Sequence, residues 1–167
     1  MIDAEFARLD DAGTPPKSRV APEPVADGAE RRMVLVDGFN VLHAVLLANE
    51  RRDGWWKREA RERLLRRVRT WPAVDDALWV AFDGSMPTWS VWAEPVAVPQ
   101  ERTQSGPIVH SVFVESADDW IVRRTRRAEE PNRMLVVTAD RQVAGRARSA
   151  GAEILSPWSF ISRCPSC

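Results

Sequence analysis

The stretch Met33-Val-Leu-Val-Asp-Gly-Phe-Asn40 decides the fold of this chain, because it has the pattern of a buried strand that ends in an aspartate and turns directly into a helix. Its apolar residues form one short continuous run, which is typical of a central parallel strand covered on both faces. An aspartate after such a strand lies at the mouth of an open α/β sheet, where ligands of these folds bind. The stretch therefore predicts a parallel α/β sheet with an acid at its ligand-binding edge.

Apolar runs and helical patterns alternate along the rest of the chain. Strands are predicted over residues 33–36, 78–82, 109–114, 135–137 and 152–155. Helices are predicted over residues 41–47, 56–70, 117–127, 141–150 and 157–162. Alternation at this spacing predicts five mostly parallel strands joined by right-handed crossovers, with residues 152–155 as an edge strand.

Four aspartates stand where a strand ends or the following helix begins: Asp37, Asp83, Asp118 and Asp140. Because the carboxyl ends of parallel strands meet at one edge of a sheet, these carboxylates are expected to converge. Clustered carboxylates keep their charge at neutral pH when a cation lies among them, most simply a divalent ion held by oxygen ligands. Each aspartate alone also fits a turn or helix cap, and the dipole of a helix N-terminus accounts for Asp118 and for its neighbour Asp119.

The regions outside this pattern have their own expectations. Residues 1–32 are rich in Pro and Ala without apolar periodicity, which predicts a disordered tail before a domain over residues 33–163. Residues 164–167 form a short C-terminal tail, and Cys164 and Cys167 within it are expected to be reduced, solvated thiols. Residues 84–107 form a Trp- and Pro-rich insert, where Trp89 and Trp92 are candidates for stacking on an unpaired base.

Charge and hydropathy limit the partners. The formal net charge is zero, and residues 33–167 carry nineteen Lys and Arg against seventeen Asp and Glu, so a nucleic-acid surface must be local. Arginines cluster on the predicted helix that carries Asp118 and on the next one, so contacts to substrate phosphates are available near the acids. Arg141, which directly follows Asp140, is the leading candidate for such a contact, whereas a solvated helix face is the simpler explanation for most of the others. The chain shows no secretory signal and no apolar run of about 20 residues, so a cytoplasmic protein with no membrane partner is expected.

Four short motifs in this order resemble a known family. They are Leu35-Val-Asp-Gly-Phe-Asn40, Phe82-Asp-Gly84, Ser116-Ala-Asp-Asp-Trp-Ile121 and Val136-Val-Thr-Ala-Asp140. Over residues 33–161 the chain resembles the PIN-like nucleases of the NYN group, and within it the YacP-like branch. The resemblance implies a three-layer α/β/α PIN-like fold in which Asp37, Asp83, Asp118 and Asp140 hold Mg²⁺ or Mn²⁺. It also implies that Asn40 orients the site, that Ser116 and Thr138 supply hydroxyls behind the metal ligands, and that Asp119 is a weaker candidate.

These observations favour a metal-dependent endoribonuclease. A bound divalent ion lowers the pKa of a water and neutralises charge on the leaving oxygen, and the products would carry a 5′ phosphate. Such a site needs no histidine, so His43 and His110 are expected to have other roles. Two alternatives stay open: a non-catalytic RNA- or ribosome-binding module, and a toxin-type ribonuclease of a toxin and antitoxin pair. A haloacid dehalogenase-type phosphatase is disfavoured, because Phe39 stands where its second aspartate belongs. The oligomeric state is open, with a homodimer as one option.

Overall fold

A five-stranded parallel sheet forms the centre of the computed structural model, which describes residues 31–49, 57–84 and 106–166. The strands are β1 (Met33–Asp37), β2 (Ala77–Asp83), β3 (Ile108–Val114), β4 (Met134–Val137) and β5 (Glu153–Leu155). The helices are α1 (Gly38–Val41), α2 (Arg58–Val68), α3 (Ala117–Arg127), α4 (Arg141–Ser149) and α5 (Pro157–Arg163). A short π-helix (Leu42–Leu46) extends α1, and a 3-10 turn (Pro131–Arg133) precedes β4.

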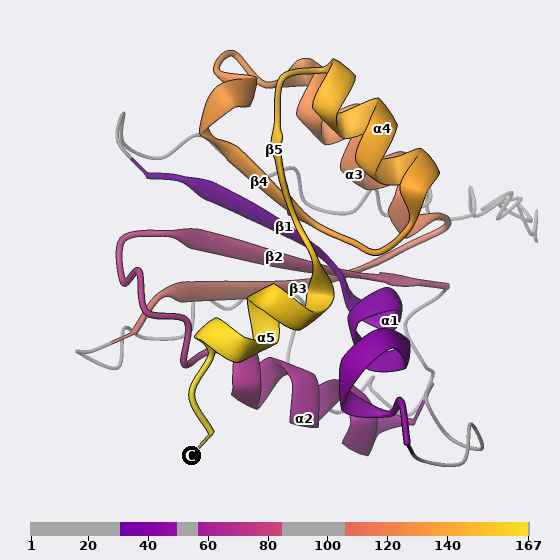
Figure 1. The fold of residues 1–167 in the computed structure, drawn as a ribbon, viewed down its shortest axis with the longest axis vertical. Coiled ribbons are helices and arrows are strands. Elements are labelled where there is room, and N and C mark those ends of the chain that lie inside the picture. The colour runs from indigo at the N-terminus through magenta and orange to yellow at the C-terminus, as the bar shows by residue number, and fades with distance from the viewer. Residues whose placement is uncertain (1–30, 50–56, 85–105, 167) are drawn as a thin grey trace, which may run out of the picture.

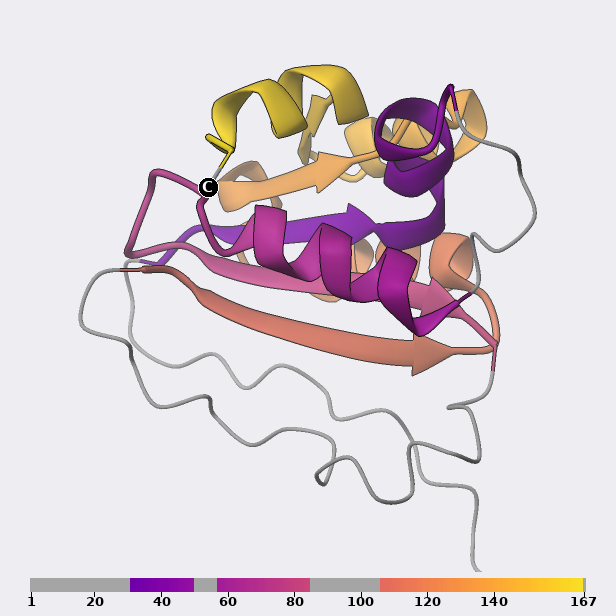
Figure 2. The same cartoon turned by 90° about the horizontal axis from the view of Figure 1, so that it is seen from below.

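The strand order is β3-β2-β1-β4-β5, and all four pairings are parallel. In Figure 2 the strand arrowheads accordingly point to one side of the molecule. The chain moves outward from β1 to β2 and β3, then crosses back over β1 to β4, so the direction of winding reverses between β1 and β4. Open α/β sheets bind ligands outside the carboxyl ends of the strands at such a reversal. Asp37, the last residue of β1, lies at this point.

Helices cover both faces of the sheet, as predicted. Figure 1 shows α3 and α4 on one side, and α1, α2 and α5 on the other. Alternate residues of β1 enter opposite layers: Val34 and Val36 pack with α2 and α5, whereas Leu35 packs with α3 and α4. This period of two is the usual consequence of strand geometry, and burial on both faces explains why the strand sequences are continuously apolar.

The predicted elements are present, with one difference in the first helix. Residues 41–47 were expected to be a regular helix, but α1 begins at Gly38 and continues from Leu42 as a π-helix. The early start follows from Asp37, whose side chain caps α1. The insert at residues 84–107 and the N-terminal tail lie mostly outside the described residues, as do Trp89 and Trp92.

Cys164 corrects one expectation. Instead of being a solvated thiol, Cys164 has no exposed surface and packs in the core beneath α5 with Phe160 and Ile161. Burial raises the pKa of its thiol to about 11. The predicted domain boundary at residue 163 stays a prediction, but the core continues at least to this cysteine.

Within the described ranges, no helix is long and apolar enough to span a membrane.

Candidate metal centre

Asp37 lies at the centre of the candidate site. The residue is 4% exposed, and its Oδ1 accepts a hydrogen bond of 3.2 Å from the backbone N–H of Asn40, in the first turn of α1. Position 38 requires a glycine, because the chain turns tightly against β2 there. A Cβ at this position would lie 2.4 Å from the Phe82 ring and 2.9 Å from the carbonyl oxygen of Ala81. The Asp-Gly pair thus places a buried carboxyl group at the end of the central strand.

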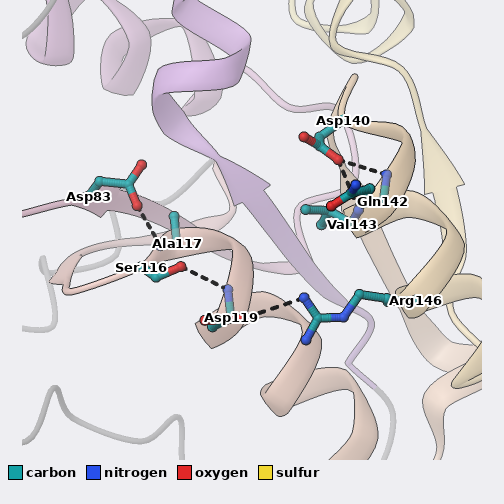
Figure 3. A network of polar contacts seen from close by, with 8 residues as sticks. All are labelled: Asp83, Ser116, Ala117, Asp119, Asp140, Gln142, Val143 and Arg146. Carbon is teal, nitrogen blue, oxygen red and sulfur yellow. Dashed lines mark hydrogen bonds and ion pairs between the residues drawn. The ribbon is translucent and has the colours of Figure 1, made fainter.

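Asp83 links the end of β2 to the start of α3. Its Oδ1 accepts a hydrogen bond of 2.7 Å from the backbone N–H of Ala117 (Figure 3). Asp118 is the next residue of α3, so this bond holds the helix start beside the end of the strand. Only one oxygen of Asp83 is used within the described part of the chain, which leaves the other for a ligand.

Asp140 begins α4 and is held in the same manner. Its Oδ1 accepts hydrogen bonds from the backbone N–H groups of Gln142, at 2.7 Å, and Val143, at 3.0 Å (Figure 3). Thr138 is buried, and its Oγ1 accepts a hydrogen bond of 3.1 Å from the backbone N–H of Asp140. The cap interpretation and the metal interpretation are therefore compatible, because capping occupies one carboxylate oxygen and leaves the second.

Asn40 joins two of these segments. Its side-chain oxygen accepts a hydrogen bond of 2.7 Å from the backbone N–H of Ala139, while its own backbone N–H donates to Asp37. These bonds link the segment between β4 and Asp140 to the first turn of α1, which follows Asp37.

Asp118 lies close enough to Asp37, Asp83 and Asp140 for each of them to affect its pKa. The pKa of Asp37 is raised to about 7, chiefly by burial and also by the negative charges of Asp118 and Asp83 and a side-chain hydrogen bond with Asp118, while the hydrogen bond from the backbone of Asn40 acts in the opposite direction. Burial also raises the pKa of Asp118, followed by the charges of Asp140 and Asp83. Asp118 therefore interacts with the other three acids. Asp37 ends β1 and Asp140 follows β4, so both lie at the same edge of the sheet.

The donor set fits a hard divalent cation. All four side chains are carboxylates, and the buried Asp37 lies beside like charges with no cationic partner among the described residues. A cation at this place would lower the pKa of Asp37 and so offset the effects of burial and of the neighbouring negative charges. Among the described residues, no group of three or more His, Cys, Asp or Glu side chains is placed so that it could hold a metal ion. Ligation of a metal by the four acids therefore stays a prediction.

Comparison with known proteins assigns the family. A model of the YacP-like NYN domain matches residues 34–166. The chain belongs to the YacP-like NYN domain family. NYN domains are ribonuclease-like, and PIN-like nucleases generally use divalent metals. The resemblance expected from the four motifs is confirmed.

Individual relatives agree with this placement. UPF0178 proteins are 31% identical over 90 residues in Bradyrhizobium diazoefficiens, 33% over 86 in Brucella ovis and 37% over 68 in Azorhizobium caulinodans. These alignments cover 52%, 52% and 38% of this chain, and 48%, 50% and 36% of the relatives. The chain thus spans about half or less of the length of these relatives, and their name states no activity.

A solved structure supports the fold. The crystal structure of Rae1 (YacP) from Bacillus subtilis superposes with a TM-score of 0.54 at 20% sequence identity, covering 79% of this chain and 74% of that chain. At this identity the likeness shows the shared architecture alone.

The remaining predicted residues of this NYN domain lie around the acids. Ser116 caps α3, because its Oγ accepts a hydrogen bond of 3.2 Å from the backbone N–H of Asp119. The Asp119 carboxylate lies 3.3 Å from a guanidinium nitrogen of Arg146 on α4 (Figure 3). Arg141 is exposed at the first position of α4. Their roles in substrate binding stay predictions.

The sequence did not reveal the cavity that Asp119 and Arg146 share with arginines of α3. The spacing on α3 carried a signal, since residues 119, 122, 123, 126 and 127 fall on one face of a helix. The contribution of α4 required the tertiary structure.

Proposed function

We propose that this chain is a metal-dependent endoribonuclease with Asp37, Asp83, Asp118 and Asp140 as the acids of its catalytic centre. The observation that carries the proposal is the coupling of Asp118 to the other three acids at the reversal of the sheet, in a member of a ribonuclease-like family. Strand topology brings three of these carboxylates to one edge of the sheet and α3 adds the fourth, so like charges are placed near one another. A shared cation would offset their repulsion.

The metal we propose is Mg²⁺ or Mn²⁺, which would supply an activated water and stabilise charge on the leaving oxygen. The protein's own residues determine where it is held. Asp83 and Asp140 are oriented by backbone N–H groups through one oxygen each, so their second oxygens are fixed in direction. Asn40 and Thr138 hold the segments that carry Asp37 and Asp140 in place. We propose RNA as the substrate and the cytoplasm as its compartment.

The test is incubation of the purified protein with a mixed RNA pool and Mn²⁺ or Mg²⁺, followed by sequencing of the new ends. Cleavage should leave 5′ phosphates, stop with chelator and be lost in Asp140→Asn. This substitution is a sharp control, because an asparagine retains the Oδ1 acceptor that caps α4 while it removes the charge. Thermal melting should confirm that the variant folds.

A matched single-stranded DNA pool tests the choice of nucleic acid. Equal cleavage of both pools would contradict the ribonuclease assignment while leaving a metal-dependent nuclease. Tight RNA binding by the wild type without cleavage under either metal would reject the enzyme and favour a binding module.

A further inference from the structure

A cavity of about 340 Å³ is lined by residues of α3 and α4. Its lining consists of Asp119, Val122, Arg123, Arg126, Arg127 and Arg146. We call this cavity the α3/α4 groove. It does not include the four proposed metal ligands, but it begins at the residue that follows Asp118. The α3/α4 groove therefore starts at the first turn of α3, the turn that also carries Asp118.

The α3 residues of the groove form one helical face. Their positions follow the i, i+3, i+4, i+7 and i+8 pattern, which places side chains one above another over two turns. Val122 is buried and supplies the floor, while Arg123 and Arg126 are exposed at the rim. Arg146 approaches from α4, which packs beside α3 in the same core layer. The groove is thus built from two elements.

The charge of the groove is strongly positive. Four guanidinium groups line it against one carboxylate, and that carboxylate, Asp119, is paired with Arg146. Arg123 and Arg126 make no hydrogen bond or ion pair with other described residues. Basic residues in the last turn of a helix also complement the helix dipole, which explains Arg126 and Arg127. The dipole does not explain Arg123, one turn earlier, or the convergence of both helices on one cavity.

We propose that the α3/α4 groove binds backbone phosphates of the substrate strand, adjacent to the phosphate that is cut at the acids. This inference rests on the proposed function, because it gives the strand a path from the catalytic centre along α3. Successive turns of α3 are about 5.4 Å apart, so arginines on one face of the helix can contact more than one phosphate of a strand. Arginine is suited to this task, since its planar fork binds phosphate oxygens in pairs.

The composition of the groove also predicts its selectivity. Its lining has no aromatic ring to stack on a base, and we assign its arginines to phosphates rather than to base edges. Contacts to phosphate fix the position of a nucleic acid without carrying sequence information. Binding through the α3/α4 groove should therefore be independent of sequence, and any preference for a sequence must arise elsewhere.

The experiment measures binding separately from cleavage. Asp37→Asn is the background, so that single-stranded RNA oligonucleotides stay intact, and fluorescence anisotropy is recorded for two unrelated sequences over a series of salt concentrations. The test variant adds Arg123→Gln and Arg126→Gln. The matched control adds Arg66→Gln and Arg69→Gln, which remove the same charge from exposed positions at the end of α2, on the other face of the sheet.

The test variant should bind both sequences at least about tenfold more weakly at low salt, since a charge-assisted hydrogen bond contributes about 1.5 kcal/mol or more. The slope of log affinity against log salt should fall by about 1.4, the value for two phosphate contacts on a single strand. The α2 control should change neither quantity as much.

Equal losses in the test variant and the α2 control would overturn the proposal, as would an unchanged salt slope. A loss confined to one of the two sequences would also contradict it, because it would indicate recognition of bases. These outcomes are distinct from failure of the proposed function: if the wild type does not cleave but the test variant binds more weakly, the α3/α4 groove stands as a nucleic-acid surface without the nuclease.

Discussion

The side-chain oxygen of Asn40 accepts a hydrogen bond of 2.7 Å from the backbone N–H of Ala139 and so ties the first helix to the connection that leads into Asp140. Asn40 also donates its backbone N–H to Asp37. One residue therefore adds a side-chain link between the end of β1 and the connection to α4, two segments that the β1–β4 pairing already places side by side.

Asn40→Ala should reduce the metal-dependent cleavage rate by about 10- to 100-fold, the usual cost of removing a group that orients metal ligands. It should lower the free energy of unfolding by only about 1 kcal/mol, since one hydrogen bond is lost. Cleavage assays over a range of Mn²⁺ concentrations and chemical denaturation measure the two effects. Asn132→Ala, an exposed position before β4, is the matched control and should change neither. Loss of stability in proportion to loss of activity would show that Asn40 is merely structural.

Gly38→Ala should destabilise the protein by about 1–3 kcal/mol, the range for overpacking a core. The added Cβ would lie 2.4 Å and 2.6 Å from two carbons of the Phe82 ring, which is buried and packed between Phe39 and Phe113. Gly145→Ala in α4 is the contrast, because a Cβ there meets nothing within 4 Å. That substitution should be neutral or stabilise by up to about 1 kcal/mol. Denaturant titration of both variants decides, and equal stabilities would refute the packing argument.

The convergence of the acids was predictable from sequence for a physical reason. Strands of a parallel sheet end at one edge, so an aspartate after each of three apolar runs is placed by topology alone. The strand order was not predictable from those runs. It matters here because the reversal between β1 and β4 makes Asp37 central.

The roles of Asp118 and Asp119 could not be separated from the sequence. Successive helical residues point about 100° apart, so only one of the two can face the cluster. In the structure their surroundings differ: Asp118 is coupled to the other acids, whereas Asp119 is paired with Arg146, and their roles stay predictions. Both outcomes depend on how α3 is rotated about its axis, which the packing of Ile121 and Val122 against the sheet determines.

Cys164 was misjudged because its position near the chain end suggested exposure. The spacing contained the opposite signal, since Cys164 follows Phe160 by four residues and continues the apolar face of α5. In a Cys167→Ser variant, Cys164 is the single thiol of the chain. Its reaction with a thiol reagent at pH 8 should be slow in the native protein and fast in denaturant, because it is buried and its pKa is raised to about 11. Rapid reaction under native conditions would contradict the burial.

Asp37→Asn should stabilise the metal-free protein at neutral and alkaline pH while abolishing cleavage. The pKa of Asp37 is raised from 3.8 to about 7 in the folded protein, so folding favours the protonated form. Stability contributed by this residue is therefore complete below about pH 4, falls as the pH rises toward 7 and is lost above it. Asparagine resembles the protonated acid and shows no such loss. The advantage of the variant should be absent near pH 4, grow to a few kcal/mol by pH 7 and then stay level.

Chemical denaturation in the presence of chelator, at half-unit steps from pH 4 to pH 9, measures this difference. Adding Mn²⁺ at pH 8 should raise the stability of the wild type and leave Asp37→Asn nearly unchanged, since the metal stabilises only the form that binds it. Glu129→Gln, an exposed acid after α3, is the control for loss of one negative charge and should follow the wild type at every pH. A pH-independent difference in stability between Asp37→Asn and the wild type would show that the pKa of Asp37 is not raised by burial and by its acidic neighbours. The argument for a cation at this edge of the sheet would then fail.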